Sequence, residues 1–367
     1  MRFVVLPGDG IGPEISDSAV AVLELLNEAL DLGITLERRA IGLATLRSLG
    51  TTFPDAALDA CRAADGIILG PISHSDYPAR AEGGINVSAE LRIALDLYAN
   101  VRPSRSRDGL PHYGRTPMDL AIVRENTEGF YVDRSMHLGA GEFMPTLDLA
   151  LSVRKITAHA SRRIAKAAFE LAARRRKNVV AVHKANVIKL SEGLFLREVR
   201  AVAREHTDVH YEECLIDSMA ALLVRDAQRF DVIVTTNMFG DILSDEASEL
   251  SGGLGLGGAI NASETHCMAQ AQHGSAPDLA GLDRANPVSL VLSVGMLLDW
   301  LARKGHAEPF ARAARVIDES IDTLVSSPAT RTRDLGGRLG TKAFTDRLCA
   351  EISRRLREAP ACSSSVG

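Results

Sequence analysis

Hydrophobic positions along the chain follow two alternating patterns. Short runs rich in β-branched residues predict buried strands at 2–6, 66–69, 120–123, 179–182 and 231–235. Longer segments with apolar residues at helical spacing predict helices at 14–30, 159–176, 196–205, 217–229, 289–304 and 308–325. This alternation of strands with helices is typical of an α/β protein with substantial parallel strand pairing.

One long segment, residues 130–151, fits neither pattern. It contains Gly139, Gly141 and Pro145 and alternates polar with apolar residues in places, which argues against a long helix. We therefore expect an extended arm or a hairpin. An arm that cannot bury its own apolar face usually packs against another subunit, so the segment also predicts an oligomer.

Composition narrows the class of protein. The 367 residues are 46% apolar and 24% charged, which excludes a disordered, collagenous or coiled-coil chain. The formal net charge of −5 and the aromatic content of 4% argue against DNA or RNA as a partner. We find no apolar run long enough for a signal peptide or a membrane span, and the five cysteines are irregularly spaced. We expect a cytoplasmic protein with no membrane partner and no disulfide framework.

A glycine-rich turn, GDGIG at residues 8–12, joins the first predicted strand to the first predicted helix. Dinucleotide-binding turns occur in the same context, but the spacing here is G-x-G-x-G rather than G-x-G-x-x-G. A tight structural turn and a phosphate or cofactor contact explain this pattern equally well.

The strongest local feature is TNMFGDILSDE at residues 236–246, which directly follows a predicted strand. Asn237 stands in the expected N-cap region of a helix that then carries Asp241 and Asp245 on one face, at i and i+4. Two like charges at this spacing repel unless a cation lies between them, and their hard oxygens suit Mg²⁺ or Mn²⁺. A solvated helix face would explain the pair in isolation, but a position after a strand favours a metal site.

Basic residues at the ends of predicted elements form the second feature. Arg92, Arg102 and Arg124 could together bind a polycarboxylate anion, although most single arginines form surface salt bridges. Lys184 follows a buried strand and is a candidate general base, although an ordinary strand-end lysine is the commoner case.

The segment HGSAPD at residues 273–278 has the composition of a shaped loop. Its Asp278 could accept hydrogen bonds from a ribose diol and would repel a 2′-phosphate. The alternative is a polar loop without a ligand.

Taken together, these segments resemble the β-decarboxylating dehydrogenases, which include the 3-isopropylmalate, isocitrate, homoisocitrate and tartrate/D-malate dehydrogenases. The resemblance spans nearly the whole chain in order: LPGDGIGPE, LDLYANVRP, VRENTEG, KANV, TTNMFGDILSDEAS, HGSAPD and ANP. It implies an α/β fold with a large mixed sheet, flanking helices, two domains and a dimer clasp arm at 130–151. Residues 1–100 and 252–367 would form a cofactor-side domain, and 101–251 a domain for substrate, metal and dimerisation.

The resemblance also implies how metal and catalytic groups are shared. Asp241 and Asp245 would bind Mg²⁺ or Mn²⁺ together with Asp217 from the other subunit of a homodimer, which could pair further into a tetramer. Lys184, also from the partner, would remove the hydroxyl proton of the substrate. Tyr131 would deliver a proton to C3 after CO₂ has left.

Substrate binding is implied for Arg92, Arg102 and Arg124, which would hold the carboxylates of a small hydroxy acid. The stretch before Arg92 would contact the C3 substituent, and it carries Ser88 and Ala89 where isopropylmalate enzymes show an apolar leucine pair. That departure weakens an isopropylmalate assignment, because an isopropyl group needs apolar contact. Isocitrate and homoisocitrate remain open.

NAD is the implied cofactor, because NADP-dependent relatives carry a cation where this chain has Asp278. The other cofactor-side positions implied by the resemblance are Ile11, Asn186, Leu254, Gly255, His273, Gly274, Ser275, Ala276 and Asn286.

The implied activity is NAD- and metal-dependent oxidative decarboxylation of a 3-substituted (2R)-malate-type 2-hydroxy acid to a 2-oxo acid and CO₂. Three alternatives stay open: a tartrate or D-malate enzyme, a metal-dependent lyase without net redox change, and a non-catalytic regulatory subunit. A degenerate regulatory subunit would be expected to have lost one or more of the catalytic residues, and all of them are present: Tyr131, Lys184, Asp217, Asp241 and Asp245.

Overall fold

A computed structural model gives the architecture of the chain and describes residues 1–131, 136 and 141–358. The strands are β1 (Arg2–Leu6), β2 (Thr35–Arg38), β3 (Gly66–Leu69), β4 (Ala99–Arg105), β5 (Asp119–Glu125), β6 (Glu142–Thr146), β7 (Leu149–Ser152), β8 (Asn178–His183), β9 (His210–Leu215), β10 (Val232–Thr235), β11 (Ile260–Ala262) and β12 (Cys267–Gln270). The α-helices are α1 (Gly12–Leu30), α2 (Leu43–Leu49), α3 (Asp55–Arg62), α4 (Val87–Ala94), α5 (Ala158–Ala172), α6 (Ser191–Glu205), α7 (Ile216–Asp226), α8 (Asn237–Ser251), α9 (Val288–Leu301), α10 (Ala307–Val325) and α11 (Thr341–Glu358).

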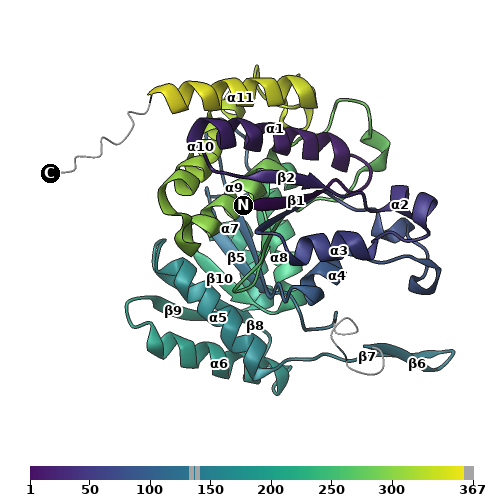
Figure 1. Cartoon of the computed structure of the whole chain (residues 1–367). Helices are drawn as coiled ribbons and strands as arrows, with labels where there is room; N and C mark the ends of the chain where they lie inside the picture. The colour runs from purple at the N-terminus through teal and green to yellow at the C-terminus, as the bar shows by residue number, and fades with distance from the viewer. Residues whose placement is uncertain (132–135, 137–140, 359–367) are drawn as a thin grey trace.

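A single large mixed sheet runs through the molecule, as expected (Figure 1). Its ten strands lie in the order β2-β1-β3-β12-β11-β4-β5-β10-β8-β9. Parallel pairs make up the two outer parts, and antiparallel pairing of β12 with β11, β11 with β4 and β4 with β5 joins them in the middle. The α/β fold class with a large mixed sheet is thereby confirmed.

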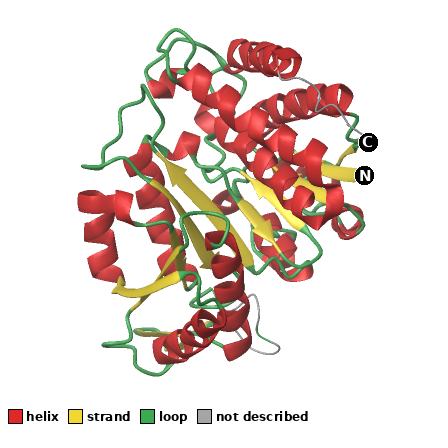
Figure 2. Ribbon diagram, turned by 90° about the vertical axis from the view of Figure 1, so that its left-hand side faces the viewer, coloured by secondary structure: helices red, strands yellow, loops and turns green. Residues whose placement is uncertain are grey.

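Helices cover both faces of the sheet (Figure 2), and the alternation of side chains along the strands explains why. On β1, Phe3 and Val5 belong to a hydrophobic cluster that includes residues of α1, α9, α10 and α11. Val4 and Leu6 point the other way, into a cluster with residues of α3 and α4. Strand β8 is also covered on both faces, with α5 and α6 on one and α7 and α8 on the other. The division of the chain into two domains stays a prediction.

All five predicted strands are present, and their bounds differ from the prediction by at most a few residues. Five further strands of the large sheet were not predicted, namely β2, β4, β9, β11 and β12. Strand β9 is half polar (HYEECL), and β11 has only three residues. Strand β4 contains Pro103, and a proline argues against assigning a strand from the sequence alone. These segments are therefore strands because they pair with neighbouring strands, and not because of their local sequence pattern.

Helix ends also depart from the pattern. The prediction of 159–176 runs too far, because α5 ends at Ala172 and Lys177 has the left-handed φ of 59°. The prediction of 217–229 spans α7 and then a 3₁₀ turn, Ala227–Arg229. Turns at helix ends provide hydrogen bonds for backbone N–H and C=O groups that have no partner within the helix, and the hydrophobic periodicity of a sequence does not predict them.

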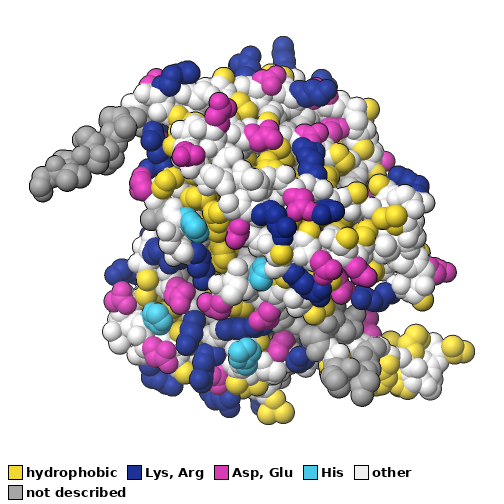
Figure 3. Space-filling model, viewed as in Figure 1, with side chains coloured by type: hydrophobic (Ala, Val, Ile, Leu, Met, Phe, Trp, Pro, Cys, Tyr) yellow, Lys and Arg dark blue, Asp and Glu magenta, His cyan; other side chains and the backbone are white. Residues whose placement is uncertain are grey.

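The predicted arm is a hairpin in its described part. Strands β6 and β7 pair antiparallel and project from the body of the molecule at the lower right of Figure 1. Figure 3 shows hydrophobic side chains on this projection, and the exposed ones include Phe143, Met144, Leu147, Leu149 and Leu151. Residues 132–135 and 137–140 of the predicted arm lie outside the described residues. The role of the arm as a dimer clasp stays a prediction.

Within the described part of the chain, no helix is both long and apolar enough to cross a membrane. The cysteines that the structure describes form no disulfide: Cys61, Cys214, Cys267 and Cys349.

Candidate active site

The middle of the sheet places three chain segments side by side. Asn100 on β4 pairs in register with Arg124 on β5, and Val101 pairs with Ile260 on β11. Ile260 in turn pairs with Ala269, next to Gln270 at the end of β12. The polar residues of β4, β5 and β12 therefore meet along one line across the sheet. Helix α8 begins directly after β10, the other neighbour of β5, and passes over the same place.

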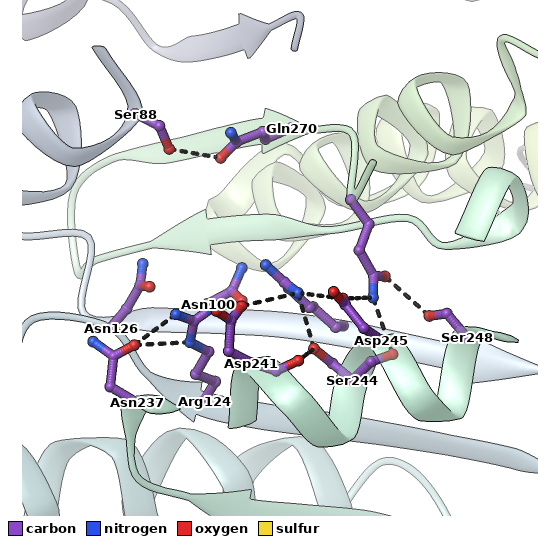
Figure 4. A network of polar contacts seen from close by, with 12 residues as sticks. Ser88, Asn100, Arg124, Asn126, Asn237, Asp241, Ser244, Asp245, Ser248 and Gln270 are labelled. Atoms are coloured by element: carbon purple, nitrogen blue, oxygen red, sulfur yellow. Dashed lines mark hydrogen bonds and ion pairs between the residues drawn. The ribbon is translucent and has the colours of Figure 1, made fainter. Parts of the chain in front are cut away.

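Two buried arginines face the two predicted metal carboxylates in this line (Figure 4). Arg124, which is 2% exposed, forms an ion pair with Asp241. Arg102, which is 8% exposed, has its Nη1 3.1 Å from Asp245 Oδ1 and 3.5 Å from Asp241 Oδ1. The close approach needs Gly240, because a Cβ there would lie 2.7 Å from Arg124 Cβ. The structure thus brings together four residues that the sequence singled out.

Asn237 does not cap the helix, contrary to the sequence pattern. The N-cap of α8 is Thr236, and Asn237 is the first helical residue. Its side-chain oxygen accepts hydrogen bonds from Arg124 Nε at 3.0 Å and Nη2 at 2.6 Å, and its amide donates to the Glu128 carbonyl at 2.9 Å. Asn237 therefore holds the guanidinium of Arg124 in place, and this second role outweighs a capping role.

Burial decides the electrostatics of the two arginines. Removal from water lowers the pKa of Arg124 to about 10, and the nearby Arg102 cation adds to this effect. Burial also lowers the pKa of Arg102, while Asp241 and Asp245 oppose that shift. Within one chain the two guanidinium groups are paired with the carboxylates of Asp241 and Asp245, which balance their charge.

A cleft of about 400 Å³ opens beside this cluster. Predicted residues that line it are Ser88, Arg92, Arg102, Arg124, Tyr131, Asp241, His273 and Gly274. The Tyr131 hydroxyl donates to Asp241 Oδ2 over 3.4 Å. Most residues assigned to substrate binding, and one end of the predicted cofactor loop, therefore share a single cleft.

The polar residues that line the cleft and were missed from the sequence are the amides Asn100, Gln270 and Gln272, and His74. The Gln270 side-chain oxygen accepts from Ser88 Oγ at 3.1 Å, from Asn261 Nδ2 at 3.2 Å and from Arg92 Nη2 at 3.4 Å. Uncharged amides give no motif by themselves. For Gln270 and Gln272, the only available signal was their position in a short polar–apolar alternation, AQAQ at residues 269–272.

Lys184 and Asp217 lie together but away from this cleft. Lys184 Nζ donates to Asp217 Oδ1 at 2.5 Å, and this hydrogen bond lowers the pKa of the carboxyl. Neither residue lines the cleft, and Asn186 beside them is exposed. Within the described residues, no three His, Cys, Asp or Glu side chains gather closely enough to hold a metal ion. One chain therefore separates Asp217 from Asp241 and Asp245.

The glycine-rich turn packs against the predicted cofactor loop. A Cβ at Gly10 would lie 2.0 Å from the Ser275 carbonyl oxygen, and the Ile11 amide donates to that oxygen at 2.8 Å. The Ile11 side chain itself is buried in the core. Ser275 Oγ also lies 2.7 Å from Ser73 Oγ. The turn thus fixes the loop, which is a structural use of its glycines.

Other cofactor-side positions surround the same loop. Asp278 is exposed at its end, and Ala276 has the left-handed φ of 39°. Burial lowers the pKa of His273, which favours the neutral form of its ring. Asn286 Nδ2 donates to Asp334 Oδ2 at 2.8 Å, and Gly255 leaves room for this pair. Leu254 precedes Gly255 in a 3₁₀ turn, Leu254–Leu256.

The donor chemistry fits the expected groups in part within one chain. Asp241 and Asp245 offer hard oxygens from one helix face, which suits Mg²⁺ or Mn²⁺, but a third carboxylate must come from elsewhere. A Cβ at Gly274 would meet no atom within 4 Å, so the loop leaves open space for a ligand there. An exposed carboxylate at Asp278 suits a ribose diol.

Comparison with known proteins gives a consistent result. The family model described as isocitrate/isopropylmalate dehydrogenase matches residues 2–349. The chain is 38% identical to the 3-isopropylmalate dehydrogenase of Archaeoglobus fulgidus over 95% of this chain and 98% of the relative. It is 40% identical to the isocitrate/homoisocitrate dehydrogenase of Thermus thermophilus over 94% and 96%. The solved structure of isocitrate dehydrogenase from Methylococcus capsulatus superposes with a TM-score of 0.84 at 36% identity, covering 96% of this chain and 99% of that one.

Proposed function

This chain belongs to the isocitrate/isopropylmalate dehydrogenase family, and from that premise we propose an NAD- and Mg²⁺- or Mn²⁺-dependent oxidative decarboxylase. Members of the family are oxidoreductases of the β-decarboxylating type. The proposed substrate is a 3-substituted (2R)-malate-type 2-hydroxy acid, converted to a 2-oxo acid and CO₂. The observation that carries the proposal is the cleft lined by Arg102, Arg124 and Asp241, with Asp245 paired to Arg102 at 3.1 Å.

The arginines bind and orient the substrate in this proposal. Arg102 and Arg124 are held by hydrogen bonds to Ser244 and Asn237, so they are preorganised for a carboxylate. Arg92 lines the same cleft from α4 and would take a second carboxylate. Binding the departing carboxylate between fixed cations sets its bond to C3 for cleavage.

Two proton transfers fall to this chain's residues. Lys184 of the other subunit would accept the proton of the substrate hydroxyl, and NAD, when bound, would supply the hydride acceptor. The β-keto acid then loses CO₂, and Tyr131 delivers a proton to C3. Asp217 of the partner, with Asp241 and Asp245, would hold the divalent cation, which would supply Lewis acidity for the developing negative charge.

A homodimer with shared active sites follows from the separation of these groups. Asp217 and Lys184 pair on the surface of one chain, away from the cleft of that chain. The β6–β7 hairpin extends its exposed apolar side chains outward, where a second copy would cover them. We therefore propose that each cleft is completed by Lys184 and Asp217 of the other protomer.

NAD is the proposed cofactor. Asp278 offers an acceptor to a ribose 2′-hydroxyl and would repel a 2′-phosphate. His273 and Gly274 line the cleft at the near end of the loop, so a cofactor bound along this loop would reach the cleft that the substrate arginines line.

The C3 subsite favours a polar substituent. Ser88 and Gln270 are hydrogen-bonded to each other on its wall (Figure 4), and Asn86 and Ala89 also line it. An isopropyl group would leave the Gln270 amide nitrogen without a hydrogen-bond acceptor, which costs about 1–3 kcal/mol. An isocitrate-type carboxylate or a hydroxyl would accept from it, so we place these substrates ahead of 3-isopropylmalate.

The test is NADH formation by the purified protein with Mn²⁺ on 3-isopropylmalate, isocitrate, homoisocitrate, D-malate and tartrate. We expect a preference of roughly tenfold or more in kcat/KM for a polar substituent, which corresponds to about 1.4 kcal/mol. EDTA should abolish turnover, and added Mn²⁺ should restore it. Folded dimeric protein without turnover on any of these acids would contradict the proposal.

A further inference from the structure

Gln272 lies where the end of the sheet, the metal carboxylates and the cofactor loop meet. It follows β12 by two residues and directly precedes His273. Its Nε2 donates to Asp245 Oδ1 and to the Ser244 carbonyl, both at 3.0 Å, and its Oε1 accepts from Ser248 Oγ at 3.1 Å. All three of these partners belong to α8.

The packing around Gln272 fixes this conformation. Its backbone amide donates to Ser289 Oγ at 3.1 Å. A Cβ at Gly257 would lie 2.4 Å from Gln272 Oε1, so the glycine makes space for the carboxamide. Hydrogen bonds at the amide nitrogen, the amide oxygen and the backbone together hold the Gln272 side chain in one conformation. The two partners of the nitrogen are oxygens that only accept hydrogen bonds, which identifies this end of the amide as the nitrogen.

One oxygen of Asp245 is thereby occupied and the other left available. Asp245 Oδ1 accepts from Gln272 Nε2 and from Arg102 Nη1. Within the described part of the chain, Asp245 Oδ2 makes no hydrogen bond, and the side chain is 54% exposed. Two donors on Oδ1 set the rotation of the carboxylate and direct Oδ2 outward. Partners of this kind orient metal ligands, and their loss typically weakens metal binding 10- to 100-fold.

We propose that Gln272 is a positioning residue that orients Asp245 for the divalent cation and ties that carboxylate to the cofactor loop beginning at His273. This inference rests on the proposed metal-dependent function. In this proposal a neutral amide that belongs to no sequence motif sets the affinity of the site for the metal ion. Because the same side chain is anchored next to the loop, metal binding and cofactor binding should also influence each other through it.

The test compares Mn²⁺ binding, measured by EPR of the free ion in the intact dimer, for the wild type and for Gln272→Met. Methionine keeps the length and removes all three hydrogen bonds of the Gln272 side chain. We expect the Kd for Mn²⁺ to rise roughly tenfold. Gln228→Met is the matched control, because Gln228 also donates to an aspartate, Asp226, but lies on the surface away from the cleft.

A second variant covers the case in which Gln272→Met does not fold. Ser248→Ala removes the hydroxyl that donates to Gln272 Oε1 without touching Asp245, and it should raise the Kd for Mn²⁺ by a smaller factor, about two- to threefold. An unchanged Kd in a folded variant would overturn the inference. A wild type that binds no Mn²⁺ would instead overturn the proposed function, so the two failures are distinguishable.

Discussion

The arginine–aspartate cluster and the Lys184–Asp217 pair differ in how completely one chain surrounds them. Arg124 is 2% exposed and is held by Asn237 and Asp241, both on α8. Asp217 lies at the start of α7 with its side chain 63% exposed, and its described ion-pair partner is Lys184. The two arginines are buried by their own chain, whereas Asp217 lies at the surface.

This difference indicates what each region requires of the protein. Buried guanidinium groups must be fixed by the chain that buries them, since an unpaired buried charge would be destabilising. An exposed lysine–aspartate pair costs little to maintain and can be completed by another subunit. In the proposed site, the arginines and Tyr131 are therefore independent of assembly, and the half formed by Lys184 and Asp217 depends on it.

Removing the exposed half should produce the largest effect. Lys184→Met should lower kcat by roughly three orders of magnitude, as expected for loss of a general base, while the Kd for Mn²⁺ and the dimer persist. The measurement is steady-state NADH formation together with Mn²⁺ EPR. Lys166→Met, an exposed lysine on α5, is the control. Undiminished turnover would remove Lys184 from the mechanism.

Weakening assembly should disable the exposed half without altering the buried one. Phe143→Ser combined with Leu149→Ser removes two half-exposed apolar side chains from each of the two hairpins of the dimer. At about 0.7 kcal/mol for each side chain, the dimer Kd should rise roughly 100-fold. Sedimentation and activity should fall off together on dilution. Leu49→Ser, another exposed leucine, should change neither. Full activity in a monomeric variant would contradict shared sites.

The smallest predicted effect sharpens the cofactor side of the comparison. Asp278→Lys should shift the ratio of kcat/KM for NAD over NADP by roughly tenfold toward NADP, because it replaces repulsion of the 2′-phosphate with attraction. The exposed position of Asp278 makes a folding defect a minor concern. A ratio that does not move would count against the ribose contact.

Much of the fold and of the candidate site could be predicted from the sequence. The buried strands and the i, i+4 aspartates of α8 follow from periodicity, and the arginines at strand ends follow from their flanking apolar runs. What could not be foreseen depends on pairing across long sequence separations. Gln270 and Gln272 acquire their contacts only when β12 is placed between β3 and β11, and the three-residue β11 has no local signal of its own. The sequence pattern predicted Asn237 as an N-cap because no local signal indicates that its side chain accepts hydrogen bonds from Arg124.

Complementation between two inactive variants tests the shared site most directly. Lys184→Met and Asp245→Asn homodimers should each be inactive, and a heterodimer purified with two different tags should regain about half the wild-type activity. In that heterodimer one cleft carries both substitutions and the other carries neither. A heterodimer as inactive as its parents would show that Lys184 and Asp245 of the same chain act together, which would contradict the account.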